Sequence, residues 1–315
     1  MNGHLFLFDF DGSIAQTFKP GPFGISVKEA YERSIYDIFG GDGLVTYEQL
    51  GGLKNRAASE LVHDLFSRNV GLTEMTRGFY EKNNNYLRGL VPEGKGFDLT
   101  WDPERVEQIA GELLVRQKLS YLIGQIDVWE NGSVWPEPCN GFRQFWRVLN
   151  EIKCEDGSCV STGVVSSGHD LFIKRTFDVW DLPHPDFLVT EDDVRGGAEL
   201  PDRIDLRVKP GPFPMMLAYE RWRQLQKRPF QNNEIHTPLV DGDHIMYFGD
   251  DPHKDGEMAV RNGVCFGLFG SDHSKFYSYR DWQEMTGIFE RNRGVFLEGR
   301  PMSELFYPRR KGIEL

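Results

Sequence analysis

The chain has 315 residues, of which 39% are hydrophobic and 13% aromatic, so it can form one large domain or two ordinary ones. With 36 basic and 48 acidic side chains, its formal net charge is −12, which opposes binding to nucleic acid or to an anionic membrane surface. No apolar run approaches the roughly 18 residues that span a bilayer, and the first residues do not resemble a signal peptide. We therefore expect a soluble, cytoplasmic protein.

The first predicted element is a strand that begins at His4 and continues as the apolar run Leu5-Phe6-Leu7-Phe8, followed by Asp9-Phe10-Asp11-Gly12-Ser13. An apolar run that ends abruptly in two carboxylates is typical of a buried parallel strand whose carboxyl end opens into a site. Asp9 and Asp11 are two residues apart, so in extended chain both side chains point the same way. Two carboxylates this close repel each other, and a site that keeps them needs a cation, a shared proton, or both. The alternative is an ordinary turn with a helix cap.

Residues 18–135 are predicted to form a separate, inserted helical domain. Segments rich in proline and glycine at 18–24 and 135–138 indicate hinges on either side of it. Apolar residues recur at helical spacing in three stretches between the hinges, at 27–36, 57–66 and 103–126. Because no strand-like alternation occurs there, we expect this block to be mostly helical and to form a separate unit.

From residue 136 onward, helical and strand patterns alternate. We predict helices at 140–153, 169–178, 213–226 and 254–262, and strands at 159–165, 186–190, 244–249 and 264–268. This order predicts a parallel sheet with helices on both faces, which the first strand must join because one strand cannot bury itself alone. The predicted fold class is α/β: a doubly wound parallel-sheet core of residues 1–17 and 136–270 with an inserted α-helical domain. Residues 271–315 are expected to be a C-terminal extension with one helix near 280–291.

Two of the later strand ends supply a hydroxyl and an ammonium group. Ser166 and Ser167 follow the strand at 159–165, where a hydroxyl and the amides that open a helix could bind a phosphate. Capping of the helix that follows is an equally good explanation of these serines. Lys209 stands just before a turn and a helix, where an ordinary surface lysine is the alternative.

A third strand end is acidic: Asp250, Asp251 and Asp255 follow the strand at 244–249. Acids at this point can simply favour the N-terminus of a helix. However, the carboxyl ends of parallel strands share the edge of the sheet at which ligands bind. We therefore expect these acids to lie near Asp9 and Asp11.

Taken together, these groups resemble the four motifs of the haloacid dehalogenase (HAD) superfamily. The motifs occur in the family's order, as Asp9-x-Asp11, Ser166, Lys209 and Gly249-Asp250-x4-Asp255. The helical insertion between the first two motifs resembles members with a cap at that position, such as phosphoglycolate phosphatase and β-phosphoglucomutase. The resemblance implies a Rossmann-like core and covers residues 4–17 and roughly 136–270. Ser13 departs from the Thr or Val usual in the family, and Gln16-Thr17 departs from the usual Asp-Ser.

The resemblance implies a phosphatase that acts on a small phosphate monoester. Asp9 would attack phosphorus and form an aspartyl-phosphate, while Asp11 would protonate the leaving alcohol and later activate water. Ser166, the Ser167 amide and Lys209 would hold the phosphoryl oxygens. A carboxylate at Asp11 argues against dehalogenation, since the dehalogenases of the family lack one there.

The resemblance also implies Mg²⁺ as cofactor. The expected ligands are the Asp9 carboxylate, the Asp11 backbone carbonyl and Asp250, which we favour over Asp251 because it directly follows Gly249. Asp255 or Asp251 would not bind the metal directly but would orient the metal-bound waters or Lys209.

Substrate specificity would come from the inserted domain. Lys54, Asn55 and Arg56 follow two glycines, where related caps send a loop over the mouth of the site, and they are candidate substrate-binding residues. An exposed first turn of a helix is the alternative explanation of these three. The expected partner is a small phosphorylated metabolite, with no nucleic acid and no membrane.

Two other functions stay open at this point. A phosphomutase would use the same aspartyl-phosphate to isomerise a sugar phosphate, and a non-enzymatic protein could bind phosphate on the same fold. The sequence makes no prediction of the oligomeric state or of the substrate.

Overall fold

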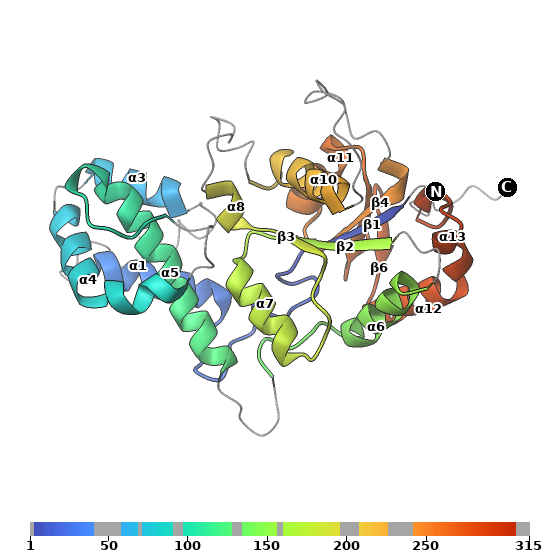
Figure 1. Cartoon of the computed structure of the whole chain (residues 1–315), viewed down its shortest axis with the longest axis horizontal. Coiled ribbons are helices and arrows are strands. Elements are labelled where there is room, and N and C mark those ends of the chain that lie inside the picture. The colour runs from blue at the N-terminus through green and yellow to red at the C-terminus, as the bar shows by residue number, and fades with distance from the viewer. Residues whose placement is uncertain are drawn as a thin grey trace. The chain divides into compact units, whose positions relative to one another are not determined.

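The computed structural model describes residues 3–40, 58–68, 71–90, 97–127, 134–155, 160–195, 208–225 and 242–306 (Figure 1). The chain divides into two compact units. Unit 1 comprises Met1–Gln16, Glu137–His169 and Phe177–Leu315, and unit 2 comprises Thr17–Pro136 and Asp170–Thr176. None of the helices in the described part of the chain combines the length and the apolar character that a membrane crossing requires.

Among the described residues, unit 1 is built on a six-stranded sheet with the order β3-β2-β1-β4-β5-β6, in which all neighbours are parallel. The strands are β1 (His4–Phe8), β2 (Val160–Val165), β3 (Phe187–Val189), β4 (Ile245–Gly249), β5 (Cys265–Phe269) and β6 (Tyr277–Tyr279). In the centre, β1 pairs with β2 on one side and β4 on the other, so that Phe8 is level with Val164 and Phe248. The predicted parallel sheet that includes the first strand is confirmed.

Helices cover both faces of this sheet because β1 is apolar on both sides. Leu5 and Leu7 face a core shared with α10 (Phe213–Leu225) and α11 (Glu257–Arg261). Phe6 and Phe8 face the opposite side and contact rings of α6 (Phe142–Lys153) and α12 (Trp282–Arg291). Figure 1 shows α10 and α11 on one side of the strands and α6 and α12 on the other. The α/β, doubly wound fold class is therefore as predicted.

The residues expected to form an extension contribute to unit 1. β6 pairs with β5 as the edge strand, α12 packs on α6, and α13 (Arg293–Leu297) follows. The predicted helix near 280–291 is confirmed, but β6 and α13 were not predicted. Both are too short, at three and five residues, for an apolar pattern to stand out from the surrounding sequence.

The remaining elements of the parallel-sheet region are short or flank the strands. They are α7 (Asp170–Val179), whose first residues fall in unit 2, α8 (Glu191–Arg195), the 3-10 helices η3 (Gly242–His244) and η5 (Met302–Glu304), and the π-helix η4 (Pro252–Gly256).

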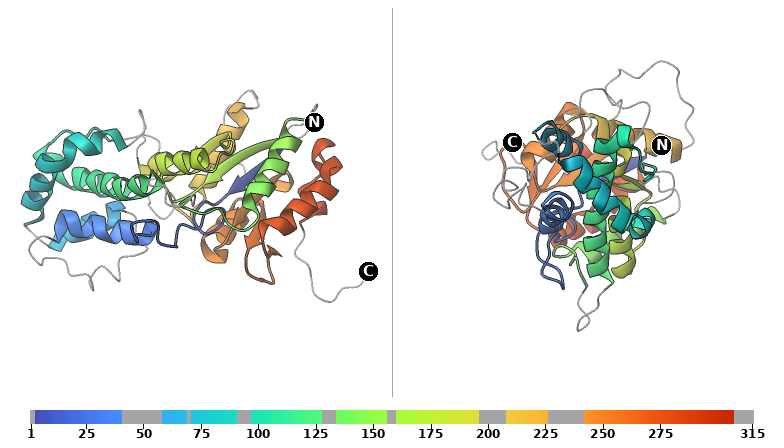
Figure 2. Two further views of the ribbon diagram at one scale, coloured as in Figure 1. Left: turned by 90° about the horizontal axis from the view of Figure 1, so that it is seen from below. Right: turned by 90° about the vertical axis from the view of Figure 1, so that its left-hand side faces the viewer.

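The described part of unit 2 is helical, as predicted for the insertion. Its elements are α1 (Val27–Phe39), α3 (Ala58–Arg68), α4 (Leu72–Leu87) and α5 (Val106–Ile126), with the 3-10 helices η1 (Arg88–Leu90) and η2 (Pro103–Arg105). α5 contacts α1, α3 and α4, and Figure 2 shows these helices gathered side by side. Because α5 meets three neighbours, its apolar residues are buried on more than one side. Within this unit Arg116 pairs with Glu112 and donates to the carbonyl oxygens of Phe97 and Arg88.

Candidate active site

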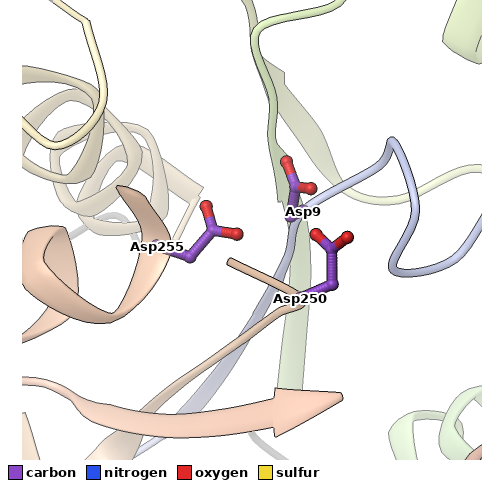
Figure 3. Close-up of side chains that lie close together, drawn as sticks. All are labelled: Asp9, Asp250 and Asp255. Carbon is purple, nitrogen blue, oxygen red and sulfur yellow. The ribbon is translucent and has the colours of Figure 1, made fainter. Parts of the chain in front are cut away.

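Three carboxylates meet at the carboxyl edge of the sheet (Figure 3). Asp9 follows β1 and Asp250 follows β4, and these two strands are neighbours. The Asp9 N–H donates to Phe248 O at 2.7 Å, which continues the pairing of the strands up to the site. One carboxylate oxygen each from Asp9, Asp250 and Asp255 lies within 4.8 Å of the other two. The register of β1 and β4 therefore brings together acids that are more than two hundred residues apart in the sequence.

Asp255 reaches the cluster because residue 249 is a glycine. A Cβ atom on Gly249 would lie 2.5 Å from Asp255 Oδ2, so a larger residue would displace this carboxylate. Asp255 belongs to η4, which Asp251 caps: Asp251 Oδ1 accepts hydrogen bonds from His253 N at 2.8 Å and Lys254 N at 3.0 Å. The two acids thus have different surroundings, since Asp251 closes a helix end and Asp255 faces the cluster.

Lys209 supplies the positive charge of the site. Its Nζ donates to Asp9 Oδ1 at 2.6 Å, to Asp255 Oδ1 at 2.9 Å and to the Tyr247 hydroxyl. A lysine ammonium carries three N–H groups, so these acceptors use all of them. The ammonium is almost fully buried, and its charge therefore acts on the two carboxylates with little screening by solvent.

Tyr247 was not identified from the sequence as a site residue. Its hydroxyl accepts from Lys209 and lies 2.8 Å from Asp255 Oδ1 and 3.3 Å from Val165 O, the acceptors for its own proton. Strand alternation places Tyr247 on the same face as Ile245, two residues before the end of β4. That position was the only signal in the sequence, and it is weak because tyrosine is common in strands.

Ser13 also enters the site without having been predicted to. Its hydroxyl donates toward Asp250 Oδ1 at 3.2 Å and toward Asp9 Oδ2 at 3.4 Å, so one proton is shared between two acids. Gly12, just before it, has a φ of +81°, a left-handed conformation that glycine adopts without strain. The serine side chain therefore places a hydroxyl between the two acids at this point.

Burial and mutual repulsion set the protonation of the cluster. Burial raises the pKa of Asp9 well above its ordinary value; Lys209 opposes this shift, and Asp255, Asp250 and Asp11 add to it. Burial also raises the pKa of Asp250 to about 6, assisted by Asp255 and opposed by the hydrogen bond from Ser13. For Lys209, burial lowers the pKa, but Asp255 and Asp9 outweigh it and raise the pKa overall. The lysine therefore stays charged, whereas negative charge on Asp9 and Asp250 is disfavoured, and a bound cation would reduce that cost.

Asp11 lies in the turn after Asp9, where its backbone forms an isolated β-bridge with that of Ala15. Its Oδ1 is buried and has no hydrogen-bond partner among the described residues. Its carboxylate is not one of the three that form the close group. A buried, unpartnered carboxylate oxygen calls for a proton, a cation or a substrate atom.

The serines that follow β2 differ in exposure. Ser166 is buried, and its Oγ accepts a hydrogen bond from Gly168 N at 2.9 Å, which leaves its own proton available to another acceptor. Ser167 is exposed. Lys54, Asn55 and Arg56, the candidate substrate-binding residues, lie outside the described residues.

The donor set fits a hard divalent cation. The close group consists of carboxylate oxygens alone, the ligands that Mg²⁺ prefers, and the buried Oδ1 of Asp11, two residues after Asp9, has no hydrogen-bond partner among the residues that the structure describes. Fold and site together define an α/β protein with a candidate cation site, built of acids and a buried lysine, at the carboxyl edge of a parallel sheet.

Comparison with known proteins finds similarity in solved structures. No protein-family model and no curated protein matches the chain. A 2-haloacid dehalogenase from Pseudomonas syringae pv. Tomato DC3000 is 17% identical, with 92% of this chain and 99% of that chain covered and a TM-score of 0.46. A HAD phosphatase from Thermococcus onnurineus is 17% identical, with coverage of 93% and 100% and a TM-score of 0.44. A HAD-superfamily hydrolase of subfamily IA from Geobacter sulfurreducens PCA is 15% identical, with coverage of 91% and 98% and a TM-score of 0.40.

Proposed function

We propose that the chain is a HAD-superfamily phosphatase that hydrolyses a small phosphate monoester with Mg²⁺, through an aspartyl-phosphate on Asp9. The observation that supports this most is the group of oxygens from Asp9, Asp250 and Asp255 within 4.8 Å of one another, beside a buried Lys209. Phosphoryl transfer depends on positioning and on charge stabilisation, and this arrangement offers both. Unit 2 would be the cap, and the domain limits predicted from the sequence are part of this proposal.

The acids have distinct proposed roles toward the metal. Asp9 and Asp250 would bind Mg²⁺ together with the backbone carbonyl of Asp11. When bound, Mg²⁺ supplies positive charge next to the phosphoryl oxygens. Asp255, which shares Lys209 with Asp9, and Asp251, which caps η4, would keep the ligands and the lysine in position.

Two carboxylates would carry the chemistry. An Asp9 oxygen forms a bond to phosphorus while the bond from phosphorus to the leaving oxygen breaks, and Asp11 gives its proton to that oxygen. A water oxygen then bonds to phosphorus, its proton passes to Asp11, and the bond from phosphorus to Asp9 breaks. The buried, unpartnered Oδ1 of Asp11 is consistent with a group that gains and loses a proton.

The remaining groups would hold the substrate. Ser166, whose hydroxyl proton is available, and the Ser167 amide would bind phosphoryl oxygens. Because all three Lys209 N–H groups are already engaged, we propose that Lys209 mainly neutralises and orients Asp9, and that it contacts a phosphoryl oxygen only by releasing one acceptor. Lys54, Asn55 and Arg56 would recognise the leaving group.

The test is release of phosphate from a panel of phosphate esters, with and without Mg²⁺, by the parent protein and two variants. We expect turnover that requires Mg²⁺ and that falls by at least about 10³-fold in Asp9→Asn, because the nucleophile is lost. Asp178→Asn is the matched control: Asp178 pairs with the exposed His184 and lies outside the cluster, so activity should be unchanged.

Other outcomes would replace the proposal. Conversion of one sugar phosphate into its isomer without release of phosphate would indicate the phosphomutase. Inertness across the panel would contradict both enzymes and favour a phosphate-binding protein.

A further inference from the structure

The backbone carbonyl of Ser13 accepts a hydrogen bond from a tryptophan at the other end of the chain. Trp282 opens α12, and its Nε1–H donates to Ser13 O at 2.8 Å, across 269 residues of sequence. The Trp282 side chain is fully buried, and its ring packs against Phe8 and Phe145. The indole is thus held by its packing, and its one polar group points to the turn that follows β1.

This turn carries candidate site residues. Ile14 N and Ala15 N both donate to Phe10 O, at 3.2 and 3.0 Å, which closes the turn directly after Asp9. Within it, Ser13 is fully buried and its hydroxyl lies between Asp250 Oδ1 and Asp9 Oδ2. A serine hydroxyl sits one carbon from the backbone, so the position of the Ser13 backbone limits the hydroxyl to the few places that the staggered rotamers reach.

The start of α12 is fixed independently of Ser13. Trp282 N donates to Asn140 O at 3.1 Å, and Asp281 caps the helix by accepting from Glu284 N at 3.0 Å. At Gly141, which has a φ of +80°, a Cβ atom would lie 2.6 Å from Gln283 N, so the two backbones approach closely. These contacts position the Trp282 indole without any contribution from its hydrogen bond to Ser13.

We propose that Trp282 is a positioning residue for the metal site: by holding the Ser13 carbonyl, it fixes the Ser13 hydroxyl between Asp9 and Asp250. The inference rests on the proposed function, in which these two carboxylates bind Mg²⁺. It gives α12, a helix outside the four motifs, a role in the site. Groups that hydrogen-bond to metal ligands orient those ligands and tune their affinity for the metal.

The experiment compares two buried tryptophans. Trp282→Phe keeps an aromatic ring and removes the N–H donor. Trp146→Phe is the matched control, because Trp146 is equally buried and contacts Phe8 as well, but its Nε1–H donates to Pro183 O, also at 2.8 Å. Mg²⁺ affinity is measured by calorimetric titration of the parent and of each variant, and thermal unfolding is recorded without metal.

We expect both variants to lose thermal stability to a similar degree, and only Trp282→Phe to bind Mg²⁺ about tenfold more weakly. Ser13→Ala should weaken binding by a similar factor. The double variant should bind Mg²⁺ about as well as the single variant with the lower affinity, because both changes break the same chain of contacts.

Each outcome decides a different point. Equal Mg²⁺ affinities in the two tryptophan variants, or additive effects of Trp282→Phe and Ser13→Ala, would overturn the inference while leaving the proposed function standing. A parent protein that binds no Mg²⁺ would contradict the proposed function itself. If Trp282→Phe does not fold, benzothienylalanine at position 282, which has the shape of tryptophan with sulfur in place of N–H, gives the same comparison against its counterpart at position 146.

Discussion

At the scale of one residue, two buried tyrosines differ in the hydrogen bonds that their hydroxyl groups make. The hydroxyl of Tyr247 contacts Lys209, Asp255 and Val165 O, whereas the hydroxyl of Tyr279 is buried without a hydrogen-bond partner in the described part of the chain. Burial raises the pKa of both phenols well above the ordinary value, so both are neutral at physiological pH. Both side chains are therefore neutral and buried, and they differ in whether the hydroxyl has hydrogen-bond partners.

We predict that Tyr247→Phe lowers the free energy of unfolding of unit 1 by about 1–3 kcal/mol, because it leaves a charged Lys209 N–H without an acceptor. Tyr279→Phe is the control and should be neutral or stabilising, since it removes a polar group that has no partner. Denaturant unfolding of both variants measures the difference. Equal losses in the two variants would show that the contacts of Tyr247 contribute nothing beyond packing.

The first helix of unit 2 illustrates stability at the scale of an element. Ser26 caps α1: its hydroxyl accepts from Glu29 N at 3.3 Å, and the Glu29 carboxylate accepts from Ser26 N at 2.7 Å. This reciprocal pair is a capping box, which satisfies two backbone donors that the helix cannot satisfy itself. The Ser26 backbone N–H, and then its hydroxyl, lower the pKa of Glu29 below the ordinary 4.5.

We predict that Ser26→Ala destabilises unit 2 by about 1 kcal/mol at pH 7. A folded-state pKa below the unfolded one means that the carboxylate contributes fully above pH 4.5 and loses this contribution as the pH falls through the folded value. The difference between parent and variant should therefore shrink at acid pH. Urea unfolding at neutral and acid pH measures it, with Ser67→Ala in α3 as the control, because Ser67 is exposed and its hydroxyl donates to Asp64 O within the same helix. A difference that does not vary with pH would contradict the role of Glu29.

At the scale of the whole molecule, each unit has a core of its own. Leu5, Met215 and Met258 belong to the core of unit 1, while Leu113 of α5 is fully buried among the helices of unit 2. The described groups of the candidate site, from Asp9 to Asp255, all belong to unit 1. Stability and metal binding should therefore respond separately to changes in the two cores.

We predict that Leu113→Ala lowers the stability of unit 2 by about 2–5 kcal/mol and leaves the Mg²⁺ affinity of folded protein unchanged. Hydrogen exchange read by mass spectrometry should show faster exchange in α1, α4 and α5, with β1 still protected. Met215→Ala in unit 1 should have the opposite effect, with faster exchange in β1 and with α1, α4 and α5 still protected. Loss of protection in β1 on Leu113→Ala would mean that the chain unfolds as a single cooperative unit.

Sequence alone determined the elements whose signal is local. β1 is buried at all five positions and apolar at four of them, from Leu5 to Phe8, as suits a strand covered on both faces, and the acids that follow it and β4 mark the strand ends. The convergence of Asp9 with Asp250 also followed from the sequence, because parallel strands share one functional edge. The assignment of roles to these residues rests on their resemblance to a family and stays a proposal until activity is measured.

Only the tertiary structure decided which groups hold these acids in place. The three acceptors of Lys209, the hydroxyl of Tyr247 and the bond from Trp282 to Ser13 join residues that are far apart in the chain. Nothing in a local pattern marks them, because a tyrosine in a strand and a tryptophan at the start of a helix serve as ordinary core residues in most proteins. Their partners are selected by how the strands are ordered and how the helices pack, and these depend on the whole fold at once.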